Sequence, residues 1–288
     1  VLTLFSISAP GDGNDAVTIT NADAFTVASG DGVDTIVVTA TTGTSGVGST
    51  LDAGDGADNI TIANGIAAGA ALTVTGGAGG DTIAVNELGN EVTVNSGSGE
   101  DTVTLAASTA TTVNAGGDND SITVGADSDA IVDGGDGTDT LVLASNDYSD
   151  DDLSFSNIEV VNIEAGNGAT LGSDQLAGDN TFELVGNGNL TTSFITLTAE
   201  TANDTVIDAS GVSTDVLTAA SIKITGNDGD DTLTHNAYSG TITGGAGNDT
   251  ISALAGDDTI TGGTGADTMT GGAGGDTFVI LAADNDVG

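Results

Sequence analysis

Aspartates recur at a fixed interval near the C-terminus, each inside a glycine-rich segment. Residues 244–279 consist of four consecutive nine-residue units, GGAGNDTIS, ALAGDDTIT, GGTGADTMT and GGAGGDTFV. Residues 226–234 and 235–243 keep the same register, although Gly240 stands where the second of these units should have an aspartate. The aspartates of this array are Asp231, Asp249, Asp258, Asp267 and Asp276. A carboxylate that recurs beside backbone carbonyls exposed by glycine supplies oxygen ligands, which suit a hard cation.

The same glycine–aspartate turn occurs upstream, once per longer period. Its aspartates follow one another at intervals of 19 to 24 residues, close to the length of two nine-residue units. We therefore expect each period to be one coil, in which one half carries the turn and the other has lost it and absorbed insertions such as 41–50 and 66–71. The upstream aspartates are Asp15, Asp34, Asp58, Asp81, Asp101, Asp120 and Asp139.

Short strands must position these turns. Glycines such as Gly244, Gly245 and Gly247 supply backbone angles closed to other residues, and the Thr-apolar tail that follows predicts a brief strand with its apolar side chain inward. Alternating runs at 17–19, 60–62, 72–74, 92–94 and 122–124 predict the matching upstream strands.

The nine-residue spacing also predicts which side chains stack. Ile251 and Met269 lie two units apart and are expected on one side of the coil, with Ile260 and Phe278 on the other. The predicted fold is therefore all-β, a parallel β-roll or β-helix solenoid.

These units resemble the nonapeptide of RTX (repeats-in-toxin) proteins over residues 10–142 and 226–279. The resemblance implies multiple Ca²⁺ ions in the turns, held by the motif aspartates and turn carbonyls, whereas Mg²⁺ demands stricter octahedral geometry. It pairs successive upstream aspartates, and in the C-terminal array it pairs Asp231 with Asp249, Asp249 with Asp267, and Asp258 with Asp276. Gly240 breaks one column, which argues against a site there. Further acids that add ligands or only negative potential are Asp12, Asp31, Asp55, Asp136 and Asp228.

The charge agrees with a cation as the partner. The chain of 288 residues has 43 acids, Lys223 as its one base and a formal net charge of −42. Such a surface repels nucleic acid and anionic lipid. A hydrophobic fraction of 38%, set beside many threonines, argues against disorder, so a bound metal is needed to neutralise the acids of a compact chain. No apolar run is long enough to span a bilayer, and one histidine without cysteine makes a zinc site implausible.

Three segments follow from the distribution of the motif: a roll with about one motif per coil over 1–142, a middle segment over 143–225 and the tandem array over 226–288. The middle segment lacks the nonapeptide but alternates like longer strands, for instance over 153–163. We expect a metal-poor β-helical section continuous with the roll, and a laterally packed insertion is the alternative. Since residue 1 is not Met, we expect a processed form or an excerpt of a longer protein.

Catalysis finds little support in the sequence, so we do not expect an enzyme. His235, the one histidine, has no nucleophile motif near it and is expected to be an exposed turn residue. The middle segment, which ends in DASGV (208–212) before dense nonapeptides, resembles bacterial surface-layer and other large secreted RTX proteins. That resemblance implies an extracellular or cell-surface location and type I secretion.

Three functions are open. The first is a structural protein (surface-layer, filament or matrix component) that folds on binding calcium and self-associates into a sheet or filament, or binds a cell-surface glycan. The second is the RTX region of a larger type I-secreted toxin, hydrolase or adhesin. The third is an ice-binding module with rows of Thr or Asn, although the uneven coil spacing counts against it.

Overall fold

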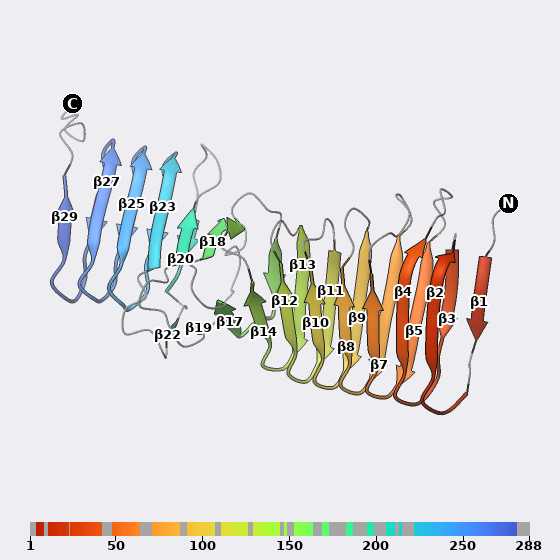
Figure 1. The fold of residues 1–288 in the computed structure, drawn as a ribbon. Helices are drawn as coiled ribbons and strands as arrows, with labels where there is room; N and C mark the ends of the chain where they lie inside the picture. The colour runs from red at the N-terminus through yellow and green to blue at the C-terminus, as the bar shows by residue number, and fades with distance from the viewer. Residues whose placement is uncertain are drawn as a thin grey trace. The chain divides into compact units, whose positions relative to one another are not determined.

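All elements that the structure describes are strands, which confirms the all-β prediction (Figure 1). The chain divides into two compact units, residues 1–144 with 151–160 (unit 1) and residues 145–150 with 161–288 (unit 2). The computed structural model describes residues 4–8, 11–22, 24–41, 48–63, 71–86, 91–106, 111–125, 129–144, 147–148, 153–163, 169–172, 183–186, 195–198, 206–210, 213–214 and 222–280. Within those ranges, no helix is long and apolar enough to cross a membrane.

Unit 1 is a solenoid of parallel strands that alternate between two sheets. The odd-numbered strands pair in the order β1-β3-β5-β7-β9-β11-β13-β16, and the even-numbered strands in the order β2-β4-β6-β8-β10-β12-β14. The strands are β1 Leu4–Ser8, β2 Ala16–Ala22, β3 Ala24–Ala28, β4 Thr35–Thr41, β5 Ser49–Asp55, β6 Asn59–Ile62, β7 Leu72–Ala78, β8 Thr82–Val85, β9 Val92–Ser98, β10 Thr102–Leu105, β11 Thr111–Gly117, β12 Ser121–Val124, β13 Ala130–Asp136, β14 Thr140–Leu143 and β16 Ser154–Ser156.

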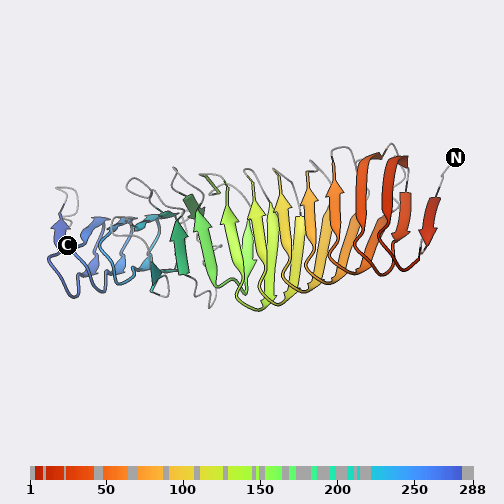
Figure 2. The same ribbon diagram turned by 60° about the horizontal axis from the view of Figure 1, so that its bottom comes forward.

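The core of unit 1 follows from the two-residue period of its strands, which sends every second side chain inward. In the even sheet the inward positions stack in register from coil to coil, and each of them is fully buried. This stack consists of Ile36, Ile60, Ile83, Val103, Ile122 and Leu141. Valines of the odd sheet, such as Val74, Val94 and Val113, form the facing stack. Sharp turns join the two layers along one edge (Figure 2).

The uneven coil length does not disturb this register. Thr73, Thr93 and Thr112 are direct partners although they lie 20 and 19 residues apart. The insertions expected at 41–50 and 66–71 fall mostly in ranges that the structure does not describe. Uneven spacing therefore gives no argument against regular outward rows, and that part of our reasoning on ice binding was wrong.

Unit 2 has the same parallel architecture with shorter coils. One sheet runs β15-β18-β20-β23-β25-β27-β29, a second runs β21-β24-β26-β28, and β19 pairs with β22. The strands are β15 Asp147–Tyr148, β18 Ala169–Gly172, β19 Glu183–Gly186, β20 Ile195–Thr198, β21 Val206–Asp208, β22 Ser213–Thr214, β23 Ile222–Asp228, β24 Thr232–Thr234, β25 Thr241–Ala246, β26 Thr250–Ser252, β27 Thr259–Thr264, β28 Thr268–Thr270 and β29 Thr277–Val279.

The stacking predicted from the nine-residue spacing is confirmed in unit 2. Ile251 is the partner of Met269, and Ile260 is the partner of Phe278. In the middle segment, residues 153–163 do not form one long strand. They form β16 and β17 (Val160–Ile163), separated by a turn that contains Asn157 with a positive φ of 52°.

Candidate metal-binding columns in the turns

Each turn uses its residues for two different purposes. In the unit that begins at Gly244 (position 1), the residues at positions 2 and 4, Gly245 and Gly247, have φ of 124° and 135°. Only these positions need the left-handed backbone. Gly244 does not have a positive φ, contrary to our expectation. It is small because a Cβ there would contact Oδ2 of Asp249, the position 6 aspartate of the same unit.

The position 6 aspartates of unit 1 form one continuous column, which we call the first column. In each coil the backbone N–H of the aspartate donates to Oδ1 of the aspartate in the following coil. The N–H to Oδ1 distances are 2.8 Å for Asp15–Asp34, 2.7 Å for Asp34–Asp58, 2.8 Å for Asp58–Asp81, 2.7 Å for Asp81–Asp101, 2.8 Å for Asp101–Asp120 and 2.8 Å for Asp120–Asp139. The structure thus brings together all seven aspartates that the sequence singled out.

Unit 2 carries one column on each of two edges. In the second column Asp231 donates to Asp249 at 2.9 Å, and Asp249 donates to Asp267 at 3.0 Å. In the third column the N–H of Gly240 donates to Asp258 at 2.7 Å, and that of Asp258 donates to Asp276 at 3.1 Å. The three aspartate pairs that the resemblance implied are therefore neighbours.

Burial makes these carboxylates poor anions. Asp34 and Asp139 are 0% exposed. Desolvation raises the pKa of Asp81 to about 6 and that of Asp101 to about 7 from an ordinary value of 3.8. The N–H bonds from Asp58 and Asp81 lower these pKa values, and the neighbouring carboxylate charges raise them, but desolvation is the largest cause. The pKa of Asp120 is raised to about 6 for the same reason.

The second carboxylate oxygen marks where a cation fits. Buried Oδ2 atoms accept no hydrogen bond from the described part of the chain in Asp15, Asp34, Asp58, Asp81, Asp120, Asp139, Asp249 and Asp258. A methyl group added at Gly244 would contact both Oδ2 of Asp249 and the carbonyl oxygen of Gly262 in the next coil. Two oxygen acceptors thus share one space that holds no donor, and this is a donor set for a hard cation.

Carboxylates alone do not complete such a site. Across the described residues there is no group of three or more His, Cys, Asp and Glu side chains that could hold a metal ion. An ion in the turns must therefore take much of its coordination from backbone carbonyls, which Ca²⁺ accepts readily.

The first column has one more member, which the sequence did not reveal. The N–H of Asp139 donates to Oε2 of Glu159 at 2.7 Å. Glu159 follows the turn between β16 and β17, where the letters SNIE show no glycine motif. Its charge adds to the rise in the pKa of Asp139, after the larger effect of desolvation.

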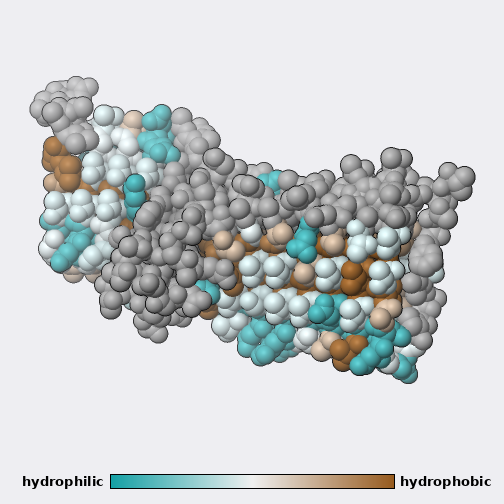
Figure 3. Space-filling model, viewed as in Figure 1, coloured by the Kyte–Doolittle hydropathy of each residue, from teal (hydrophilic) through white to brown (hydrophobic). Residues whose placement is uncertain are grey.

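The additional turn acids do not join the columns. Asp12, Asp31, Asp55, Asp136 and Asp228 occupy position 2 or 3 of their units and are exposed. Hydrophilic residues gather along the turn edge of unit 1, at the lower right of Figure 3. A second ladder that we did not predict is built instead by position 5. For example, Asn14 Oδ1 accepts the N–H of Val33 at 3.0 Å, and Asp257 Oδ1 accepts that of Gly275 at 2.7 Å.

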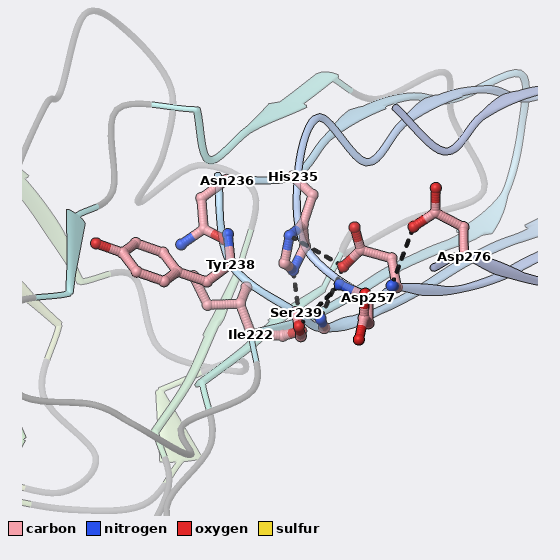
Figure 4. Close-up of polar contacts among 9 residues, drawn as sticks. Ile222, His235, Asn236, Tyr238, Ser239, Asp257 and Asp276 are labelled. Atoms are coloured by element: carbon pink, nitrogen blue, oxygen red, sulfur yellow. Dashed lines mark hydrogen bonds and ion pairs between the residues drawn. The ribbon is translucent and has the colours of Figure 1, made fainter. Parts of the chain in front are cut away.

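His235 is not the exposed turn residue that we expected. It is 0% exposed, and its imidazole points toward the carbonyl of Ile222 (Figure 4).

Stacked parallel coils with an aspartate column in their turns define a calcium-binding β-solenoid as the class of this protein. The family model of the RTX calcium-binding nonapeptide repeat matches four copies in residues 223–237 and 243–278. Residues 223–278 therefore carry the RTX repeat, a repeat typical of secreted calcium-binding proteins. No curated protein matches the chain.

Proposed function

We propose that the chain is an extracellular, calcium-dependent structural protein of a cell surface, a surface-layer, filament or matrix component secreted by a type I system. One observation carries the proposal: columns of buried carboxylates, with Oδ2 atoms that lack a donor, occur in both units. Buried charge without a partner is costly, so a cation that binds only the folded columns stabilises the fold.

Calcium then acts as the switch for folding. Where calcium is scarce, repulsion among the acids of a chain with a net charge of −42 opposes compaction, and the chain stays exportable. Outside the cell, ions at a concentration far above their dissociation constant stabilise the folded state by mass action. Multiple ions bind along the three columns.

The form of the described chain supports a structural role over an enzymatic one. Its residues are almost entirely short strands and the turns between them, and its one histidine is buried in a turn. Outward rows of Thr, Ser and Asn on regular parallel sheets offer repeated hydrogen-bonding groups to a second copy or to a surface glycan. We therefore propose that the product of folding is the solenoid and its assembly.

A calcium titration with two readouts tests the proposal. Far-UV circular dichroism should show little β-structure in EGTA and a cooperative gain on addition of calcium, with magnesium much less effective. Electron microscopy of the calcium-loaded chain should show sheets or filaments. Full β-structure in EGTA, unchanged by calcium, would refute the coupling. Calcium-dependent folding without assembly would leave the RTX region of a larger secreted protein as the function.

Ice binding has one observation in its favour, the in-register row of Thr73, Thr93 and Thr112 on the odd sheet. The neighbouring row contains Asp52 and Asp133, whose charges interrupt it. A freezing-hysteresis measurement on the calcium-loaded chain separates this function from the structural one.

A further inference from the structure

The turn at His235 exchanges the sizes of two residues that all other described turns keep fixed. From Ser29 onward, position 1 is Gly, Ala or Ser wherever position 6 is Asp. In the unit 235–243 position 1 is His235 and position 6 is Gly240. The contact across the turn is preserved with its members reversed. A Cβ on Gly244 would contact Oδ2 of Asp249, and a Cβ on Gly240 would contact Nε2 of His235.

The imidazole takes over a hydrogen bond inside this turn. Nε2 of His235 lies 3.1 Å from the carbonyl oxygen of Ile222. A carbonyl only accepts, so Nε2 carries the hydrogen and donates it. A buried backbone acceptor is thus satisfied by a side chain of the protein itself (Figure 4).

The imidazole also faces the next member of the third column. Nδ1 of His235 lies 3.9 Å from Oδ1 of Asp258, and both side chains are 0% exposed. The ladder itself continues past the exchange, because the N–H of Gly240 still donates to Oδ1 of Asp258 at 2.7 Å. Turn geometry and stacking are therefore kept at a position that has no carboxylate.

We infer that His235 replaces both the motif carboxylate and the calcium ion in this turn, so that the turn folds without metal and the third calcium column begins only at Asp258. A hard cation needs oxygen ligands, and here a nitrogen heterocycle fills the space that the carboxylate occupies in the other turns. The inference rests on the proposed calcium-dependent function.

This assignment gives the unit 2 solenoid a metal-independent coil directly before the dense repeats. In calcium-free solution the amides of residues 222–243 should keep more protection from hydrogen exchange than those of residues 244–278, because only the first segment has its turn closed by protein groups alone.

A double-mutant cycle tests the exchange. Gly240→Asp alone places a carboxylate against the imidazole, and His235→Gly alone leaves the Ile222 carbonyl without its donor. Each should lower the melting temperature in saturating calcium. The double variant H235G/G240D restores the small–large order of the other units. It should recover the melting temperature in calcium, bind an additional calcium ion by equilibrium dialysis and lose protection in EGTA over residues 222–243. A double variant that binds no additional ion overturns the inference, as does an additional ion bound by H235G alone.

The reverse exchange keeps the test decisive if the double variant does not fold. G244H/D249G moves the His–Gly pair into the second column, and D249G is its matched control. Both should bind fewer calcium ions than the wild type, but G244H/D249G should melt at a higher temperature than D249G. Equal melting temperatures overturn the inference. If the wild type binds no calcium, the proposed function fails as well, whereas calcium binding that D249G reduces leaves that function standing whatever the exchange shows.

Discussion

Glu159 accepts the backbone N–H of Asp139 at 2.7 Å, so a glutamate occupies the place of an aspartate at the end of the first column. The turn that carries it is shorter. Asp133 and Ser156 are strand partners, and the rung residue follows six positions after Asp133 but only three after Ser156. The extra methylene of glutamate spans the distance that the shorter turn leaves.

Removing this acceptor should loosen the end of the column. Glu159→Ala leaves the Asp139 amide without its partner, which costs about 1–2 kcal/mol locally, or roughly a tenfold faster amide exchange. Glu159→Gln keeps an acceptor oxygen and should exchange several times more slowly than the alanine variant. Hydrogen exchange at Asp139, followed by NMR, measures both. Equal exchange in Glu159→Ala and the wild type would contradict the assignment.

Without calcium, the chain should become more stable as the pH falls. The folded-state pKa values of Asp81 and Asp101 are raised by burial to about 6 and about 7, above the ordinary 3.8. Folded protein therefore binds these protons more tightly than unfolded protein. The contribution is complete below about pH 4 and is lost as the pH rises through 6 to 7. Thermal melts in EGTA between pH 4.5 and 8 check the sign, and a melting temperature that rises with pH would contradict it.

Calcium binding should have the opposite pH dependence. Protons compete with the ion for the same carboxylates, so calcium affinity should fall as the pH drops below about 7. Calorimetric titrations at pH 6 and pH 8 measure this. The matched variant Asp101→Asn lacks the most strongly shifted of these carboxyls, so its affinity should change less with pH than that of the wild type.

Column acids and exposed turn acids should differ in their effect on calcium binding. Asp101→Asn keeps an oxygen for the Asp81 amide but removes a buried charge, and calcium affinity at its site should fall about tenfold or more. The exposed Asp136 lies outside the column, so Asp136→Asn should change affinity by less than about twofold. Equal losses in the two variants would show that turn acids act as ligands as well.

Two adjacent glycines separate backbone requirement from composition. Gly116 has a φ of 115°, and a Cβ on it would contact the carbonyl oxygen of Gly97, whereas a Cβ on Gly117 would contact nothing within 4 Å. Gly116→Ala should destabilise unit 1 by about 2 kcal/mol or more, and Gly117→Ala should be close to neutral. Urea unfolding in saturating calcium compares them, and similar midpoints for the two variants would refute the steric argument.

Much of the fold could be predicted because a nine-residue period fixes which residues stack. The partnership of Ile251 with Met269 follows from spacing alone. The column in unit 1 was likewise visible, since the aspartates recur once per coil. The uneven intervals obscured the register, because sequence distance does not show whether extra residues fall in a strand or between strands.

What the sequence could not show depends on how side chains meet across a turn. Glu159 was missed because its turn is short and lacks glycine. His235 was misplaced because a lone histidine in a turn is ordinarily exposed, and only the contact with Gly240 shows why it is buried. The size relation between positions 1 and 6 is present in the sequence, but it becomes meaningful once Asp249 is seen to lie over Gly244.

Each column member bonds only to the members directly before and after it, and this makes ion loading a one-dimensional problem. In such a chain the response to one altered member depends on where it stands. A change at Asp15 shortens the run of coupled sites by one, whereas a change at Asp81 divides it into two short runs, each with lower cooperativity. Identical substitutions along the column should therefore give calcium curves of different steepness, in an order set by position alone.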